Sequence, residues 1–106
     1  MGIFSMFGSG KDMKAKVDEA KSNGASIIDV RERGEYAGGH IPGAKNVPLS
    51  VFQSSFAKTC PDKNAPVALY CASGARSSRA ASAAKSMGYT NVTNLGGIMN
   101  YNGPLE

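Results

Sequence analysis

Short apolar runs alternate with helix-like segments along the chain, which predicts an α/β fold with a parallel sheet covered by helices on both faces. SIIDV (residues 26–30) and VALYC (residues 67–71) have the length and composition of buried strands. Between Arg76 and Met87 the sequence is rich in alanine and predicts a helix, which Gly88 is placed to end. Ligands gather at the carboxyl ends of parallel strands, so the residues after these two runs are the first candidates for a site.

Further helices are expected before and after the first strand. Residues 11–22 predict a helix that Asn23-Gly24 stops, with three apolar side chains on one face: Met13, Val17 and Ala20. Residues 50–59 predict a second helix with Ser50 as its N-cap and three side chains turned inward: Val51, Phe52 and Phe56. Shorter elements are expected elsewhere, namely a helical turn near 35–37 and strands at 45–47 and 92–95.

The size and composition indicate one globular domain over residues 1–106, since 42% of the residues are hydrophobic and 19% are charged. No stretch approaches the roughly 20 apolar residues of a membrane span. Residues 1–10 lack the features of a signal peptide, so we expect a cytoplasmic protein whose first ten residues are flexible or form a first short strand. The final Leu105-Glu106 has the pattern of a cloning remnant and is given no role in the function.

Basic residues dominate the second half of the chain and predict an anionic ligand. From position 63 onward the single acidic residue is Glu106, against four basic ones: Lys63, Arg76, Arg79 and Lys85. The net charge is +4, but there is no Lys/Arg run interleaved with aromatic residues. We therefore expect no nucleic acid and no membrane as partners.

The segment CASGARS, residues 71–77, places a thiol where an α/β fold would hold it over a helix N-terminus. The free amides and dipole of the following helix, together with Arg76, would favour a thiolate at Cys71. Small side chains let the backbone curl around the sulfur, and Gly74 can adopt a positive φ. An inert core cysteine is the alternative.

The spacing in this loop also bears on the chemistry. Four residues separate Cys71 from Arg76, whereas cysteine enzymes that hydrolyse phosphate monoesters need a longer ring for a tetrahedral dianion. A tighter ring suits a smaller guest, such as one sulfur atom carried on the cysteine.

Several motifs together resemble the rhodanese-like sulfurtransferases. They are CASGARS (71–77), YAGGHIPGAKNVP (36–48), IIDVRERGEY (27–36) and GYTNVTNLGGI (88–98). This resemblance implies a sheet of about five parallel strands flanked by helices. It also implies that Cys71 takes the outer sulfur of thiosulfate or a persulfide donor and passes it to a thiol or cyanide, with no metal or organic cofactor.

The candidate site residues follow from the loop and the resemblance. Cys71 and Arg76 are the expected catalytic residues, and the expected substrate-binding residues are Ala72, Ser73, Gly74, Ala75, Ser77 and Arg31. The expected partners are a small anionic sulfur donor and a thiol acceptor, either a small molecule or a protein. The expected oligomeric state is a monomer.

Other reactive side chains are interpreted structurally. His40 lies in a tight turn, and Asp29, at the end of a strand, needs a partner such as Arg31, Arg33 or a backbone amide. Cys60 has no motif of its own and is interpreted as a bystander rather than a resolving thiol. Family members often carry a tryptophan shortly after the Gly-Gly pair, where this chain offers Tyr101.

Three functions compete for this site. The first is a sulfurtransferase, and the second is a non-turnover sulfur carrier or an anion-binding regulatory module. The third, a cysteine phosphatase or arsenate reductase, is disfavoured by the short loop. Turnover with a small donor and acceptor would separate the first from the second.

Overall fold

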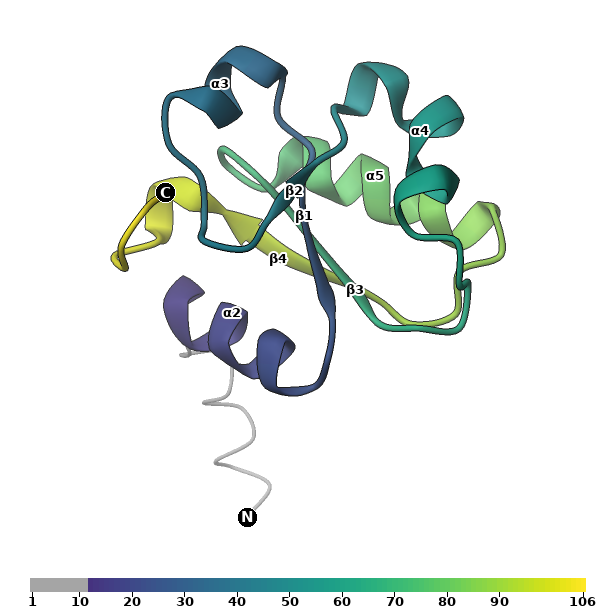
Figure 1. Cartoon of the computed structure of the whole chain (residues 1–106), viewed down its shortest axis with the longest axis horizontal. Coiled ribbons are helices and arrows are strands. Elements are labelled where there is room, and N and C mark those ends of the chain that lie inside the picture. The colour runs from purple at the N-terminus through teal and green to yellow at the C-terminus, as the bar shows by residue number, and fades with distance from the viewer. Residues whose placement is uncertain (1–11) are drawn as a thin grey trace.

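The computed structural model describes residues 12–106 and contains a four-stranded parallel sheet (Figure 1). The strands are β1 (Ser26–Asp29), β2 (Lys45–Asn46), β3 (Val67–Cys71) and β4 (Val92–Gly97), in the order β2-β1-β3-β4. The predicted parallel α/β sheet is thus confirmed. The first strand suggested for residues 1–10 lies outside the described residues.

Helices cover both faces of this sheet. Figure 1 shows α2 (Met13–Ser22) on one side of the strands, with α4 (Phe52–Thr59) and α5 (Ala75–Ser86) on the other. Shorter helical segments connect them: α3 (Arg33–Ala37), η2 (Leu49–Val51) and η3 (Ile98–Asn100). None of the helices in residues 12–106 is long and apolar enough to cross a membrane.

Side chains of the central strand β3 alternate between two hydrophobic cores. Val67, Leu69 and Cys71 pack in the core that α4 and α5 close. Ala68 and Tyr70 pack in the other core, beneath α2. Successive side chains of a strand point to opposite faces, so the odd positions all face α5. The thiol of Cys71 is therefore on the face of the sheet where α5 begins.

Helix ends fall close to the predicted positions. The α2 helix ends with Asn23 as its C-cap, followed by Gly24 at φ +79°, and α5 ends one residue before Met87. Gly88, with φ +99°, occupies the left-handed conformation that glycine adopts without strain. The prediction that a glycine follows the C-terminal end of each of these two helices is thus confirmed.

The predicted start of α4 is wrong. Residues 49–51 form a 3₁₀ turn after Pro48, and α4 begins at Phe52 with Val51 in the N-cap position. Ser50 is not the cap, since its hydroxyl donates to the Glu32 carboxylate at 3.0 and 3.1 Å. The tighter 3₁₀ turn shifts the helical phase, which leaves Val51 40% exposed while Phe52 and Phe56 are buried as expected.

Candidate active site

The thiol of Cys71 lies at the junction between β3 and α5. Gly74 is the N-cap of α5 and has φ +107°, so the backbone turns back toward the sulfur as anticipated for this glycine. The Gly74 amide donates to Sγ at 3.0 Å, and the Ser77 amide donates at 3.3 Å. Two amides at a helix N-terminus thus point at one sulfur atom, an arrangement that stabilises negative charge.

These contacts change the acidity of the thiol. Burial is the largest influence and raises the pKa of Cys71. Hydrogen bonds from the side chain and amide of Ser77, then from the amides of Gly74 and Ser73, act in the opposite direction. Together they lower the pKa of Cys71 below its ordinary value of 9.0, so the thiolate population at neutral pH is larger than for an ordinary cysteine.

Asn94 supports this arrangement and was missed by the sequence analysis. Its Oδ1 accepts from the Ser77 hydroxyl at 2.7 Å and from the Gly96 amide at 3.0 Å. The Ser77 hydroxyl has one proton, and its acceptors include the Gly74 carbonyl oxygen at 3.1 Å as well as Asn94 and the Cys71 sulfur. A polar residue on a strand has no sequence signal for such a role, because the contact depends on how β4 lies beside α5.

Arg76 is held by a residue that the sequence analysis did not single out. Its guanidinium makes a bidentate ion pair with Glu35 of α3, with N–O distances of 2.7 and 2.9 Å. Hydrogen bonding from Arg76 lowers the pKa of Glu35 to about 2. Arg76 therefore links the first turn of α5 to α3, and its charge is already balanced by a carboxylate.

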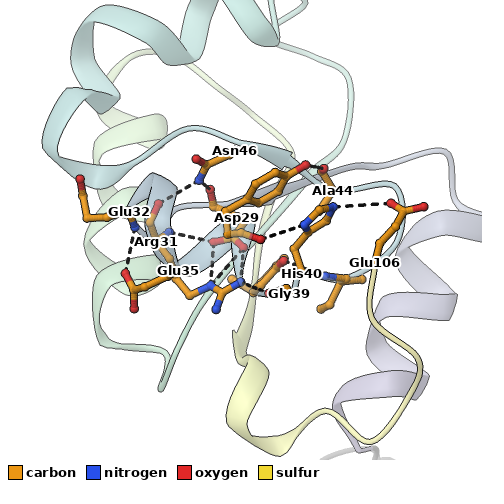
Figure 2. A network of polar contacts seen from close by, with 12 residues as sticks. Asp29, Arg31, Glu32, Glu35, Gly39, His40, Ala44, Asn46 and Glu106 are labelled. Carbon is orange, nitrogen blue, oxygen red and sulfur yellow. Dashed lines mark hydrogen bonds and ion pairs between the residues drawn. The ribbon is translucent and has the colours of Figure 1, made fainter.

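Arg31, expected near the substrate, is paired within the fold (Figure 2). Its Nη2 lies 2.7 Å from Oδ2 of Asp29 and donates to the Gly39 carbonyl at 2.8 Å. Asp29 is fully buried and Arg31 is 7% exposed. The predicted pairing of Asp29 is confirmed, with Arg31 as the partner.

His40 also makes contacts within the fold (Figure 2). Its ring stacks on Tyr36 with centroids 3.7 Å apart, and Nδ1 lies 3.0 Å from the Tyr36 carbonyl oxygen. Nε2 lies 3.5 Å from Glu106, whose amide and carbonyl oxygen also bond the backbone of His40. These contacts agree with the structural role expected for this histidine.

The second cysteine lies away from the loop. Cys60 is the C-cap of α4, is buried and unpaired, and accepts a hydrogen bond from the Tyr89 hydroxyl through its carbonyl oxygen. Burial raises the pKa of its thiol, and Ser26, at the start of β1, contacts it. Cys71 instead ends β3, so the two thiols lie toward opposite ends of the sheet.

The rest of the loop is small and closely packed. The Ala72 carbonyl oxygen accepts from the Met99 amide at 3.1 Å, which ties the loop to η3. Behind the loop is a cavity of about 270 Å³ lined by Ser73, Gly96 and Gly97 together with residues of α2, but not by Cys71. Among residues 12–106, no three His, Cys, Asp or Glu side chains gather closely enough to hold a metal ion.

Comparison with known proteins agrees with this geometry. The family model of the rhodanese-like domain matches residues 9–103, and the chain belongs to this family. The uncharacterised protein YqhL of Bacillus subtilis is 43% identical over 83 residues, which are 77% of this chain and 64% of YqhL. The thiosulfate sulfurtransferase PspE of Escherichia coli is 42% identical over 71 residues, which are 67% of this chain and 68% of PspE. A solved structure of a rhodanese with anions from E. coli has a TM-score of 0.72 and 38% identity, over 77% of this chain and 96% of that one.

Proposed function

We propose that the chain is a sulfurtransferase that moves a sulfane sulfur from thiosulfate or a persulfide donor to a thiol or cyanide, through a persulfide on Cys71. One observation carries the proposal: the sulfur of Cys71 accepts two amide hydrogen bonds at the N-terminus of α5. The similarity to a thiosulfate sulfurtransferase supports the same reaction class.

The first step of the proposed reaction consumes a thiolate. The Cys71 thiolate attacks the outer sulfur of thiosulfate, a new S–S bond forms, and the old one breaks with its electron pair leaving on sulfite. The enzyme retains a persulfide with one negative charge. An acceptor thiolate then attacks the outer sulfur of that persulfide and restores the Cys71 thiolate. Charge balances in both steps without an added oxidant.

The backbone has donors left for the outer sulfur. Ala75 and Arg76 are the first two residues of α5, where the helix itself provides no acceptor for the amide. Their N–H groups follow directly after the amide that already binds Sγ. A persulfide anion curled toward this turn would be stabilised as an oxyanion is in other sites.

Only a small projecting atom of the donor can reach the thiol, because Cys71 is only 1% exposed. The outer sulfur of thiosulfate or of a persulfide projects from the donor and can reach such a thiol, whereas attack on a phosphate ester requires the thiol to reach the phosphorus at the centre of its tetrahedron. The small loop residues leave donor recognition to backbone amides and to the rim of the site. We infer that a monomer in the cytoplasm is the working form and that neither nucleic acid nor membrane takes part.

Intact-protein mass spectrometry tests this function directly. Reduced wild type is incubated with thiosulfate beside Cys71→Ser and Cys60→Ser, and the mass gained is measured before and after adding a thiol acceptor. The proposal expects wild type and Cys60→Ser to gain one sulfur atom and then lose it to the acceptor, while Cys71→Ser gains none.

Three results would contradict the proposal. Sulfur gain by Cys71→Ser would place the persulfide elsewhere. Sulfur gain by wild type without loss to any thiol or to cyanide would favour a carrier over an enzyme. Absence of sulfur gain on a reduced, alkylatable Cys71, with thiosulfate and with a low-molecular-weight persulfide, would remove the sulfur-transfer function altogether.

A further inference from the structure

Arg76, the only side-chain cation of the cysteine loop and the first turn of α5, forms an ion pair with Glu35. Each carboxylate oxygen of Glu35 accepts a hydrogen bond from one guanidinium nitrogen of Arg76, at 2.7 and 2.9 Å. Oε1 of Glu35 also accepts from the Glu32 amide at 2.9 Å, within the capping box of α3. Both side chains are partly exposed, 33% for Arg76 and 39% for Glu35, so the pair lies at the surface of the site.

This pair bears on anion binding because Arg76 lies in the first turn of α5, which begins at the cysteine loop, and its guanidinium interacts electrostatically with Cys71. A free guanidinium there would attract any anionic donor toward the sulfur. With Glu35 bound, the pair carries no net charge, and a donor that binds Arg76 must compete with an intramolecular carboxylate. Neutralisation of Arg76 removes more attraction from a dianion such as thiosulfate than from a monoanion, since Coulomb energy scales with the charge of the ligand.

We propose that Glu35 is a positioning residue that holds and neutralises Arg76, and thereby tunes the site away from dianionic donors and toward monoanionic persulfides. This inference rests on the proposed function and specifies the class of donor. Glu35 touches neither the sulfur nor the loop amides in the interactions described above, so it acts through Arg76. The loop amides would stabilise the persulfide whether or not Arg76 is paired.

The decisive variant is Glu35→Gln, which keeps the shape of the side chain and an oxygen for the Glu32 amide but removes the charge. We expect the KM for thiosulfate to fall roughly threefold to tenfold at low ionic strength. This decrease in KM should become smaller as salt is added, because salt screens the charges. The KM for a monoanionic low-molecular-weight persulfide should fall less. The change should appear mainly in KM, because the amides that serve the reacting sulfur stay in place.

Three further variants separate charge from structure. Glu35→Asp keeps the charge and should keep the KM for thiosulfate near the wild-type value. In Glu35→Gln/Arg76→Ala the decrease in KM for thiosulfate should disappear, because the Arg76 guanidinium that Glu35→Gln leaves unpaired has been removed. Arg79→Ala is the matched control, since Arg79 lies one turn further along α5, is exposed and makes no ion pair within residues 12–106, and it should leave both constants unchanged.

A second measurement needs no sulfur transfer. In a Cys60→Ser background, the alkylation rate of Cys71 is measured with anionic iodoacetate and with neutral iodoacetamide at the same pH. The ratio of the iodoacetate rate to the iodoacetamide rate reports the local electrostatic potential. A change in the pKa of Cys71 alters both rates equally and therefore cancels in this ratio. Glu35→Gln should raise this ratio severalfold, and Glu35→Gln/Arg76→Ala should not.

The two measurements distinguish failure of the inference from failure of the proposed function. An unchanged alkylation ratio in a folded Glu35→Gln protein would overturn the role of Glu35. So would an alkylation ratio that rises equally in Glu35→Gln/Arg76→Ala. A raised ratio in a protein that takes up no sulfur would support the charge-setting role of Glu35 while refuting the sulfurtransferase. A KM for thiosulfate that rises in Glu35→Gln would overturn the proposed donor preference.

Discussion

Gly97, the last residue of β4, lies directly against the backbone of Ser73 in the cysteine loop. A Cβ atom at position 97 would come within 2.6 Å of the Ser73 Cα and 2.3 Å of the Ala72 carbonyl oxygen. Both distances are far below van der Waals contact, and both neighbours are backbone atoms. Only glycine at position 97 therefore allows the loop to lie where it presents its amides to Cys71.

Gly97→Ala should displace the loop and slow sulfur uptake at Cys71. We expect a loss of about 1–3 kcal/mol in the free energy of unfolding, because the overpacked methyl group must push the backbone away. Urea denaturation and the rate of persulfide formation measure the two effects. Gly34→Ala is the matched control: a Cβ there meets nothing within 4 Å, and alanine favours the helix. Equal rates for wild type and Gly97→Ala would show that the loop does not depend on this contact.

The two thiols should titrate in different pH ranges. Hydrogen bonding lowers the pKa of Cys71 below 9.0, whereas burial raises that of Cys60 above it. Only the thiolate reacts with iodoacetamide, so the Cys71 rate should reach half its maximum below pH 9.0 and Cys60 should still be slow there. Peptide mass spectrometry of protein alkylated at successive pH values measures both profiles. A Cys71 midpoint at or above that of Cys60 would contradict the assigned acidity.

Ser77→Ala tests whether the Ser77 hydroxyl donates to the Cys71 sulfur or serves Asn94 alone. Removing it takes away the strongest of the hydrogen-bonding influences that lower the thiol pKa, while the amide at position 77 remains. The Cys71 alkylation midpoint should move to higher pH, and persulfide formation at pH 7 should slow. Ser78→Ala provides the control, since Ser78 is exposed and its neighbours on α5 are unchanged. If both variants titrate alike, the hydroxyl contributes nothing to thiol acidity.

Arg31→Met should cost stability rather than donor affinity. The change leaves the fully buried carboxylate of Asp29 with the amide of residue 31 but without its cationic partner, and breaking a buried pair on one side costs about 3–5 kcal/mol. Asp29→Asn/Arg31→Met should be less destabilised than Arg31→Met alone, because no buried charge is left over. Urea denaturation measures the stability of each variant, and steady-state kinetics measures the KM for thiosulfate. A stable Arg31→Met protein with a raised KM would make Arg31 a substrate-binding residue instead.

Local pattern predicted the elements that carry the site. The runs that became β1 and β3 are apolar and β-branched, the helix α5 is rich in alanine, and Gly74 has the positive φ that its place before the helix suggested. These features depend on backbone preference and burial over a few residues, which a sequence displays directly. The error at Ser50 and Val51 is of another kind, since one 3₁₀ turn shifted the phase of a helix that was otherwise correctly expected.

By itself, the sequence determined that a thiol would stand at a strand-to-helix turn among small residues, because strand, turn and helix preferences are local. Only the tertiary structure decided which side chains surround that thiol. Glu35 reaches Arg76 across 41 positions of the chain, Asn94 reaches Ser77 across 17, and Gly97 lies against the loop from the neighbouring strand. Such contacts arise from the order of parallel strands and the packing of helices on them, and no short-range pattern records them. The pairing of Asp29 was expected from the sequence, but only the structure decided that its buried carboxylate pairs with Arg31 rather than with Arg33.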